Sequence, residues 1–191
     1  MTDETVPSDI PTSRMLSWAR NSAIYRLERR MMTEKQLFDA ITRKAKEKFE
    51  EISAAQLKAI ADFAVKFAYD NKVLDDSAYA EISTRSAVRG GKSKRAIAQK
   101  LAAKGVSSDK VEAALEEADD LYAAAIFVRK RAFGPFRRVE LDEKRKAKEL
   151  SAFARNGFSF DIGRKIFDMS FEDAEEIIFA GRSAAPQHQR S

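Results

Sequence analysis

The chain has 191 residues, with 35 Lys and Arg against 30 Asp and Glu, a net charge of +5 and an isoelectric point near 9.4. It contains no cysteine, and its one histidine, His188, lies in a polar C-terminal segment, so disulfides, thiolate zinc sites and a cysteine nucleophile are excluded. No run of about 18 apolar residues is present, and residues 1–13 are acidic, contain two prolines and lack an apolar stretch. We therefore expect a disordered N-terminal tail, no signal peptide, no membrane segment and a cytoplasmic protein.

Three helices are predicted in the first third of the chain. From Arg14 onwards, apolar residues recur at the three- and four-residue spacing of one helix face. Thr33 followed by Gln36, and Ser53 followed by Gln56, have the spacing of capping boxes, so each pair predicts the start of a further helix.

The middle of the chain is divided by turn residues. Residues 71–74 interrupt the helical pattern, and one residue of the Asp75-Asp76 pair can cap the next helix. Gly90-Gly91 ends that helix because glycine adopts a positive φ at little cost. Ser93 caps the following helix, and Gly105 ends it.

The last third of the chain is also predicted to be helical. Residues 108–127 carry helical periodicity and form either one helix or two. Gly134-Pro135 is a strong break, after which helices are expected over about 140–155, 160–168 and 171–179. Since no sustained alternation of apolar and polar residues occurs, we predict no β-sheet.

A sequence motif recurs along these predicted helices. Residues 93–106 and 146–158 align when Gly105 is placed on Gly157, and residues 33–45 share the same frame without the glycine. A unit of about 50–60 residues that recurs about three times is typical of helical repeat proteins. The predicted fold is therefore all-α: tandem three-helix repeats, in three units, forming an elongated, curved modular protein. The predicted divisions are a tail at 1–13, repeats at 14–73, 74–119 and 120–181, and a disordered tail at 182–191.

The first copy departs from this pattern. The charged segment 44–51 stands where the other two copies have a glycine turn, and it can extend the preceding helix or form a loop. We therefore expect the first repeat to bend differently.

Basic residues gather in two strongly charged blocks that flank an acidic one at 107–121. Such blocks suit nucleic acid or an acidic protein groove, although a plain solvated surface is the simpler interpretation. Phe133 and Phe136 could stack on bases beside the second block, but their interpretation as local core is favoured. The candidate binding residues are Arg85, Arg89, Lys92, Lys94 and Arg95 in the first block, and Arg129, Lys130, Arg131, Arg137 and Arg138 in the second.

Catalytic patterns are missing from the sequence. It has no phosphate-binding loop, no cluster of metal ligands and no Ser-His arrangement. Asp75-Asp76 is interpreted as a helix cap, and the acidic run 112–120 as a solvated helix face. We therefore expect neither an enzyme nor a cofactor.

Four segments resemble the RecX family of regulators of the RecA recombinase. They are AIYRLERRMMTEKQLFDAI at 23–41, LDDSAYA at 74–80, GGKSKRAIAQKLAAKGV at 90–106 and FARNGFSFDIGRKIF at 153–167. The resemblance covers about residues 20–180, and it rests on the order and spacing of these segments.

The resemblance implies a function as well as a fold. Proteins of this family bind the groove of the RecA–single-stranded DNA filament and inhibit ATP hydrolysis, filament growth or strand exchange, in DNA repair and recombination and in the SOS response. It implies a monomer that contacts single-stranded DNA within the filament and anchors electrostatically through its cations. Arg85, Arg89, Lys92, Lys94 and Arg95 match the basic stretch of the family.

Two other classes of function stay open from the residues alone. Three helices in a small unit also describe a helix-turn-helix DNA-binding domain, which would make the chain a transcription regulator. A repeat protein can also be an adaptor that grips another acidic protein.

Overall fold

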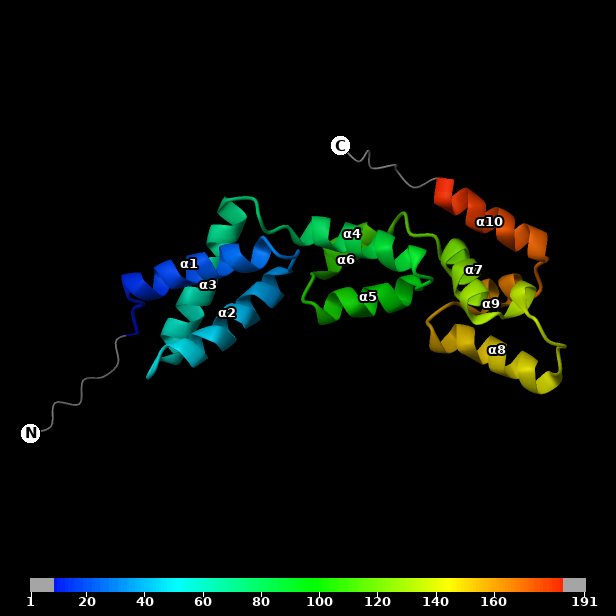
Figure 1. The fold of residues 1–191 in the computed structure, drawn as a ribbon, viewed down its shortest axis with the longest axis horizontal. Helices are drawn as coiled ribbons and strands as arrows, with labels where there is room; N and C mark the ends of the chain where they lie inside the picture. Colours follow the sequence, from blue (N-terminus) through cyan, green and yellow to red (C-terminus); the bar gives the residue numbers. More distant parts are fainter. Residues whose placement is uncertain (1–8, 184–191) are drawn as a thin grey trace, which may run out of the picture. The chain divides into compact units, whose positions relative to one another are not determined.

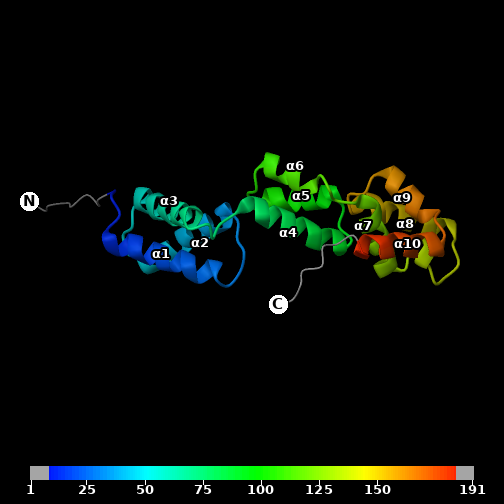
Figure 2. The same ribbon diagram turned by 90° about the horizontal axis from the view of Figure 1, so that it is seen from above.

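The computed structural model describes residues 9–183 and confirms the all-α prediction. Within this range the chain forms ten α-helices and one short 3-10 turn, η1, and has no strand (Figure 1, Figure 2). No helix in the described range is long and apolar enough to span a membrane. The helices are α1 Ser13–Leu27, α2 Glu34–Lys48, α3 Ala54–Asp70, α4 Asp76–Arg89, α5 Lys94–Ala103, α6 Ser108–Leu115, α7 Asp120–Arg131, α8 Glu143–Arg155, α9 Phe160–Phe167 and α10 Phe171–Ser183, with η1 at Gly134–Phe136.

Contacts divide the chain into two compact units. Unit 1 contains the residues up to Ala80 together with Leu101–Lys110, and unit 2 contains Glu81–Lys100 together with the residues from Val111 onwards. Helices α4, α5 and α6 are therefore each divided between the two units, although they belong to one predicted repeat.

In unit 1, α3 packs against both α1 and α2. The apolar faces of these helices meet in a core that includes Leu37, Ile41 and Ile60, all fully buried. Both predicted capping boxes are present, because Thr33 and Ser53 each exchange hydrogen bonds with the glutamine three residues later. These local signals therefore predicted the helix starts correctly.

Unit 1 begins before the predicted end of the N-terminal tail. The carboxylate of Asp9 accepts a hydrogen bond from the Ser53 hydroxyl, and the carbonyl of Ile10 accepts one from the Gln56 side chain. Thr12 caps α1, which starts at Ser13. The prediction of disorder up to residue 13 is corrected for residues 9–13, because these contacts attach them to the start of α3. Residues 1–8 lie outside the described range.

In unit 2, α7 packs against α9 and α10, and α8 packs against α9. Residues 122–128 of α7 are all buried, and Phe127 contacts the rings of Phe153 and Phe158 in the core. Phe133 and Phe136 are partly buried against this core, which supports their interpretation as core residues. The helical pattern over 108–127 is resolved as two helices, α6 and α7.

Helix α10 is additional to the nine helices that three three-helix repeats would supply. It lies so close to α7 that a Cβ atom at Gly181 would come within 2.2 Å of the Tyr122 ring. The helix continues to Ser183, beyond the predicted start of the C-terminal tail at 182. The rest of that tail, with His188, lies outside the described residues.

Each unit contains the same kind of junction, in which a buried hydroxyl at the start of one helix binds a backbone carbonyl at the end of another. In unit 1 the buried Thr33 hydroxyl donates a 2.6 Å hydrogen bond to the carbonyl of Lys104. In unit 2 the buried Ser93 hydroxyl donates a 2.7 Å hydrogen bond to the carbonyl of Asn156. Each hydroxyl also caps its own helix, α2 or α5. The helix cap of one repeat thus also binds the helix end of the next.

Paired aspartates complete each junction. The first of each pair caps its own helix: Asp75 accepts from the Ala78 N–H, and Asp119 does the same at the start of α7. The second reaches back, so that Asp76 accepts from the Glu34 N–H at 2.8 Å and Asp120 from the Lys94 N–H at 2.7 Å. The Asp75-Asp76 pair caps α4 as predicted, and its second residue also binds the start of α2. The interpretation of the run up to residue 120 as a solvated face is wrong for Asp120, which is half-buried, whereas Asp119 is exposed and caps α7.

In each repeat, the turn that follows the second helix (α2, α5 or α8) contains one residue of positive φ. Gly105 and Gly157 have φ values of +83° and +82°, and an added Cβ would lie 2.4 Å from the Lys35 side chain or 2.7 Å from the Ser93 hydroxyl. In the first repeat, Glu51 takes this position with a φ of 56°. Glu51 is exposed, so its side chain needs no room beside a neighbouring helix. The first repeat therefore has this turn as well. It lies at Glu51, six residues after residue 45, which aligns with Gly105.

Candidate functional site

All ten predicted binding cations belong to unit 2, and the α4–α5 turn brings their two groups together. Gly91 in this turn has a φ of +78° and lies so close to α7 that a Cβ would be 2.9 Å from the Phe127 nitrogen. The ammonium of Lys130 on α7 donates a 3.0 Å hydrogen bond to the carbonyl of Gly90. The C-terminal end of α7 therefore lies beside the turn that carries Lys92.

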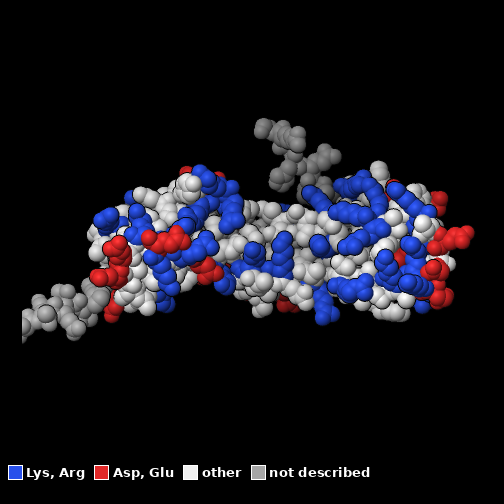
Figure 3. Space-filling view, turned by 60° about the horizontal axis from the view of Figure 1, so that its bottom comes forward, with Lys and Arg blue, Asp and Glu red and all other residues white. Residues whose placement is uncertain are grey.

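The first group presents most of its cations to solvent. Arg85 and Arg89 on α4, Lys92 in the turn and Arg95 on α5 are exposed, and none of them forms an ion pair within the described residues. Lys94 is half-buried, and its backbone N–H is bound to Asp120. In Figure 3, Lys and Arg side chains are spread over the visible face of unit 2, and the acidic side chains visible on this face lie mainly at its right-hand end.

The second group is more varied. Arg129 lies 3.5 Å from Glu175, and both side chains are well exposed, so this contact is weak. The guanidinium of Arg131 lies 5.7 Å from the centre of the Phe127 ring and stays exposed. Arg138 is exposed and forms no ion pair within residues 9–183. Arg131 and Arg138 are thus free to bind an anion, while Lys130 is engaged with the turn.

Arg137 is an interior residue, unlike the other members of its group. Its side chain is 15% exposed and forms two hydrogen bonds, of 3.0 and 2.7 Å, with the fully buried Glu149. Glu149 also accepts from the Gly134 N–H, and the Arg137 guanidinium lies 5.1 Å from the Phe167 ring centre. The sequence did not predict this pair, because it joins residues on either side of a loop.

The pKa values of this pair follow from its geometry. Burial alone would raise the pKa of Glu149, but the hydrogen bonds from Arg137 and from the Gly134 N–H outweigh burial and lower it. The hydrogen bond with Glu149 raises the pKa of Arg137. Both groups are therefore charged at neutral pH, and the pair holds η1 against α8.

One exposed cation beside the first group was not among the predicted site residues. Arg155 ends α8 directly before Asn156, whose carbonyl binds Ser93 at the start of α5. The recurring motif could have indicated it, since Arg155 aligns with Arg43 in the first copy and with Ala103 in the second.

The exposed cations of this surface can bind anions. Within residues 9–183 no group of three or more acidic or histidine side chains is arranged to hold a metal ion. Exposed Arg and Lys without acidic partners attract phosphates or carboxylates, and the attraction weakens as salt is added. The geometry therefore fits an electrostatic interface.

Comparisons with known proteins agree on one family. A family model described as the second three-helix domain of RecX matches residues 75–115. The chain is 69% identical over 168 residues to regulatory protein RecX of Agrobacterium fabrum, covering 88% of this chain and 91% of that protein. It is 35% identical over 159 residues to regulatory protein RecX of Myxococcus xanthus, covering 80% and 85%.

Solved structures share the fold at low sequence identity. A crystal structure of regulatory protein RecX aligns with a TM-score of 0.63 at 21% identity, covering 81% of this chain and 72% of that one. A crystal structure of RecX from Lactobacillus salivarius aligns with a TM-score of 0.64 at 19% identity, covering 86% and 99%. Both likenesses support tandem helical repeats.

Proposed function

Because the chain belongs to the RecX family of regulatory proteins, we propose that it regulates the RecA recombinase, mainly as an inhibitor. In this proposal it binds the groove of the RecA–single-stranded DNA filament and slows ATP hydrolysis, filament growth and strand exchange during DNA repair and the SOS response. The observation that carries the proposal is the 69% identity over nearly the whole length of one RecX protein.

The charge distribution of unit 2 supports an electrostatic mode of action. The exposed cations Arg85, Arg89, Lys92 and Arg95 form no ion pair within residues 9–183, and the end of α7, which carries Arg131, adjoins the turn with Lys92. Such a surface is attracted to a groove lined with DNA phosphates and acidic side chains. In this mechanism the protein occupies the groove and performs no chemistry of its own.

The remaining expectations belong to the same proposal. The repeats would be 14–73, 74–119 and 120–181, and the family model over 75–115 falls within the second of them. The protein would act as a monomer in the cytoplasm, where it would contact single-stranded DNA only as part of the filament.

A titration of RecA ATPase activity tests the proposal. Purified protein is added below RecA stoichiometry to filaments on single-stranded DNA, and ATP hydrolysis and strand exchange are followed together. We expect both rates to fall. Unchanged ATPase activity with unchanged strand exchange would reject the proposal.

A binding assay separates this function from that of a helix-turn-helix transcription regulator. A transcription regulator would bind one duplex sequence in preference to others and retain that preference at moderate salt. We expect binding to DNA without sequence preference that weakens steeply with salt. Sequence-specific duplex binding would favour the transcription regulator.

A further inference from the structure

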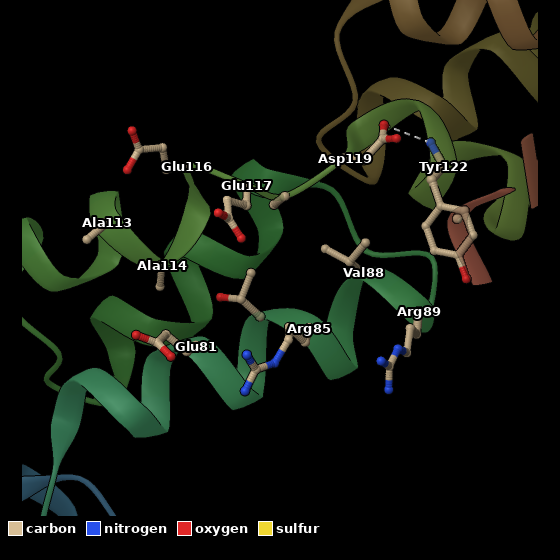
Figure 4. Close-up of a pocket in the computed structure, with 13 residues that line it drawn as sticks. Glu81, Arg85, Val88, Arg89, Ala113, Ala114, Glu116, Glu117, Asp119 and Tyr122 are labelled. Atoms are coloured by element: carbon tan, nitrogen blue, oxygen red, sulfur yellow. Dashed lines mark hydrogen bonds between the residues drawn. The ribbon is translucent and has the colours of Figure 1, made fainter. Parts of the chain in front are cut away.

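Unit 2 contains a hollow of about 600 Å³ that the cationic surface does not account for. Helix α4 forms one wall, and the end of α6 with the turn that follows forms the other (Figure 4). Its apolar lining comes from Val88, Ala113, Ala114, Ala118 and the Tyr122 ring. The small alanine side chains on the α6 wall leave room for an apolar side chain from outside.

A buried hydroxyl without a partner lies in the wall of this hollow. Thr84 on α4 lines it and is 3% exposed, and its Oγ1 forms no hydrogen bond within the described residues. Leaving a buried polar group unsatisfied costs about 1–3 kcal/mol.

The charges around the hollow do not suit nucleic acid. Arg85 and Arg89 stand on the α4 wall, but four carboxylates also line the hollow. None of these six side chains pairs with another across the hollow within residues 9–183. The excess of carboxylates repels phosphates and attracts a cation. The four carboxylates belong to Glu81, Glu116, Glu117 and Asp119.

We propose that this hollow is a protein-docking site that takes a polypeptide segment with an apolar side chain next to a Lys or Arg. The apolar side chain fills the space between Val88 and Ala114, and the cation faces the carboxylates. This inference rests on the proposed function, and it assigns the hollow to the RecA subunits of the filament. The phosphates are left to Lys92, Arg95 and Arg131. Contacts with protein and with DNA would then be made by separate parts of unit 2.

Two variants test the proposal, each with a matched control. Ala114→Trp fills the hollow, and Ala147→Trp adds the same side chain on an exposed part of α8. Glu117→Lys reverses a charge at the hollow, and Glu112→Lys does so on α6 outside it. Binding is measured to RecA without DNA, to an oligo-dT single strand and to the assembled filament, and far-ultraviolet circular dichroism confirms that each variant is folded.

We expect Ala114→Trp and Glu117→Lys to weaken binding to RecA by about tenfold or more, as truncation of a central interface contact does. Neither Ala114→Trp nor its control Ala147→Trp changes the charge, so neither should change the affinity for oligo-dT. Thr84→Val keeps the shape of the side chain and removes the unsatisfied hydroxyl, so it should leave RecA binding unchanged while the unfolding midpoint stays the same or rises.

Each other outcome is decisive. If the unmodified protein inhibits the filament and both hollow variants bind RecA as well as their controls do, the hollow is not the docking site and the proposed function stands. If Ala114→Trp instead weakens binding to oligo-dT, the hollow holds nucleic acid and the inference is wrong. If the unmodified protein leaves RecA unaffected, the proposed function fails and this inference fails with it.

Discussion

The Ser93 hydroxyl donates a 2.7 Å hydrogen bond to the carbonyl of Asn156, a residue 63 positions further along the chain. Ser93 is fully buried and also caps α5, so one hydroxyl satisfies two helix ends. Ser93→Ala should therefore lower the free energy of unfolding by about 2 kcal/mol, combining a lost cap with a carbonyl left unsatisfied. Ser93→Thr should cost much less, because Thr33 fills the equivalent position in unit 1. Urea unfolding of both variants, followed by circular dichroism, measures this, and equal midpoints would contradict it.

Asp76 should tolerate asparagine better than alanine. Burial raises the pKa of Asp76 more than its bond from the Glu34 N–H lowers it, so the site does not favour the charge itself. Asparagine keeps an oxygen that accepts from this N–H, whereas Asp76→Ala leaves it unsatisfied at a cost of about 1–3 kcal/mol. Thermal unfolding of the two variants tests the order. An asparagine variant as unstable as the alanine variant would show that the charge matters.

The three turn residues of positive φ should respond differently to substitution. Gly105→Ala and Gly157→Ala introduce a Cβ at a positive φ and against a neighbouring helix, so each should cost more than about 1 kcal/mol. Glu51→Gly should be within about 0.5 kcal/mol of neutral, because relief of the left-handed backbone offsets the added freedom of the unfolded chain. Denaturant midpoints of the three variants give the comparison, and a tolerant Gly157 would contradict the close contact with Ser93.

The Arg137–Glu149 pair should make stability depend on pH in the acid range. The folded protein lowers the pKa of Glu149, so the pair stabilises the fold fully above the ordinary glutamate pKa. This contribution is lost as the pH falls through the lowered value. Glu149→Gln should cost about 3 kcal/mol at neutral pH, because it leaves the guanidinium of Arg137 without its buried counter-charge. The variant should also lose less stability between neutral pH and pH 3, as measured by urea unfolding. An unchanged pH dependence would assign acid unfolding to other carboxylates.

Salt dependence should identify the cations that contact DNA. Each phosphate contact on a single strand contributes about 0.7 to the slope of log affinity against log salt. Replacing Lys92, Arg95 and Arg131 together with alanine should therefore reduce the slope by about 2, in an anisotropy titration with oligo-dT. The matched control replaces Lys44, Lys58 and Lys66, which pair with Glu47 on α2 and with Asp62 and Asp70 on α3. An equal loss of slope in the control would show that binding depends on overall charge alone.

The sequence predicted the helix starts well because their signals are local. Thr33, Ser53 and Ser93 each cap a helix within three residues, so the pattern and the structure report the same interaction. The all-α fold was predictable for a similar reason, since the apolar spacing within each helix is short-range.

The roles that depend on distant partners could not be predicted. Asp120 appeared as one of several acids in a run, and only the folded chain brings it to the Lys94 N–H. Arg137 appeared equivalent to Arg138, but a buried Glu149 takes it into the core. Glu51 could not be identified as the turn residue from the sequence. Helix α2 is longer than α5, so the turn is displaced along the chain, and its residue of positive φ is not a glycine.

The repeated junction also bears on the order in which the chain folds as it leaves the ribosome. Translation delivers helix α2 well before Asp76 and Lys104, and helix α5 well before Asp120 and Asn156. Synthesis at about 5–20 residues per second leaves each helix end incomplete for seconds until its downstream partner emerges. A nascent chain that stops before residue 120 therefore exposes an unfinished α5, so premature termination should yield a substrate for proteases.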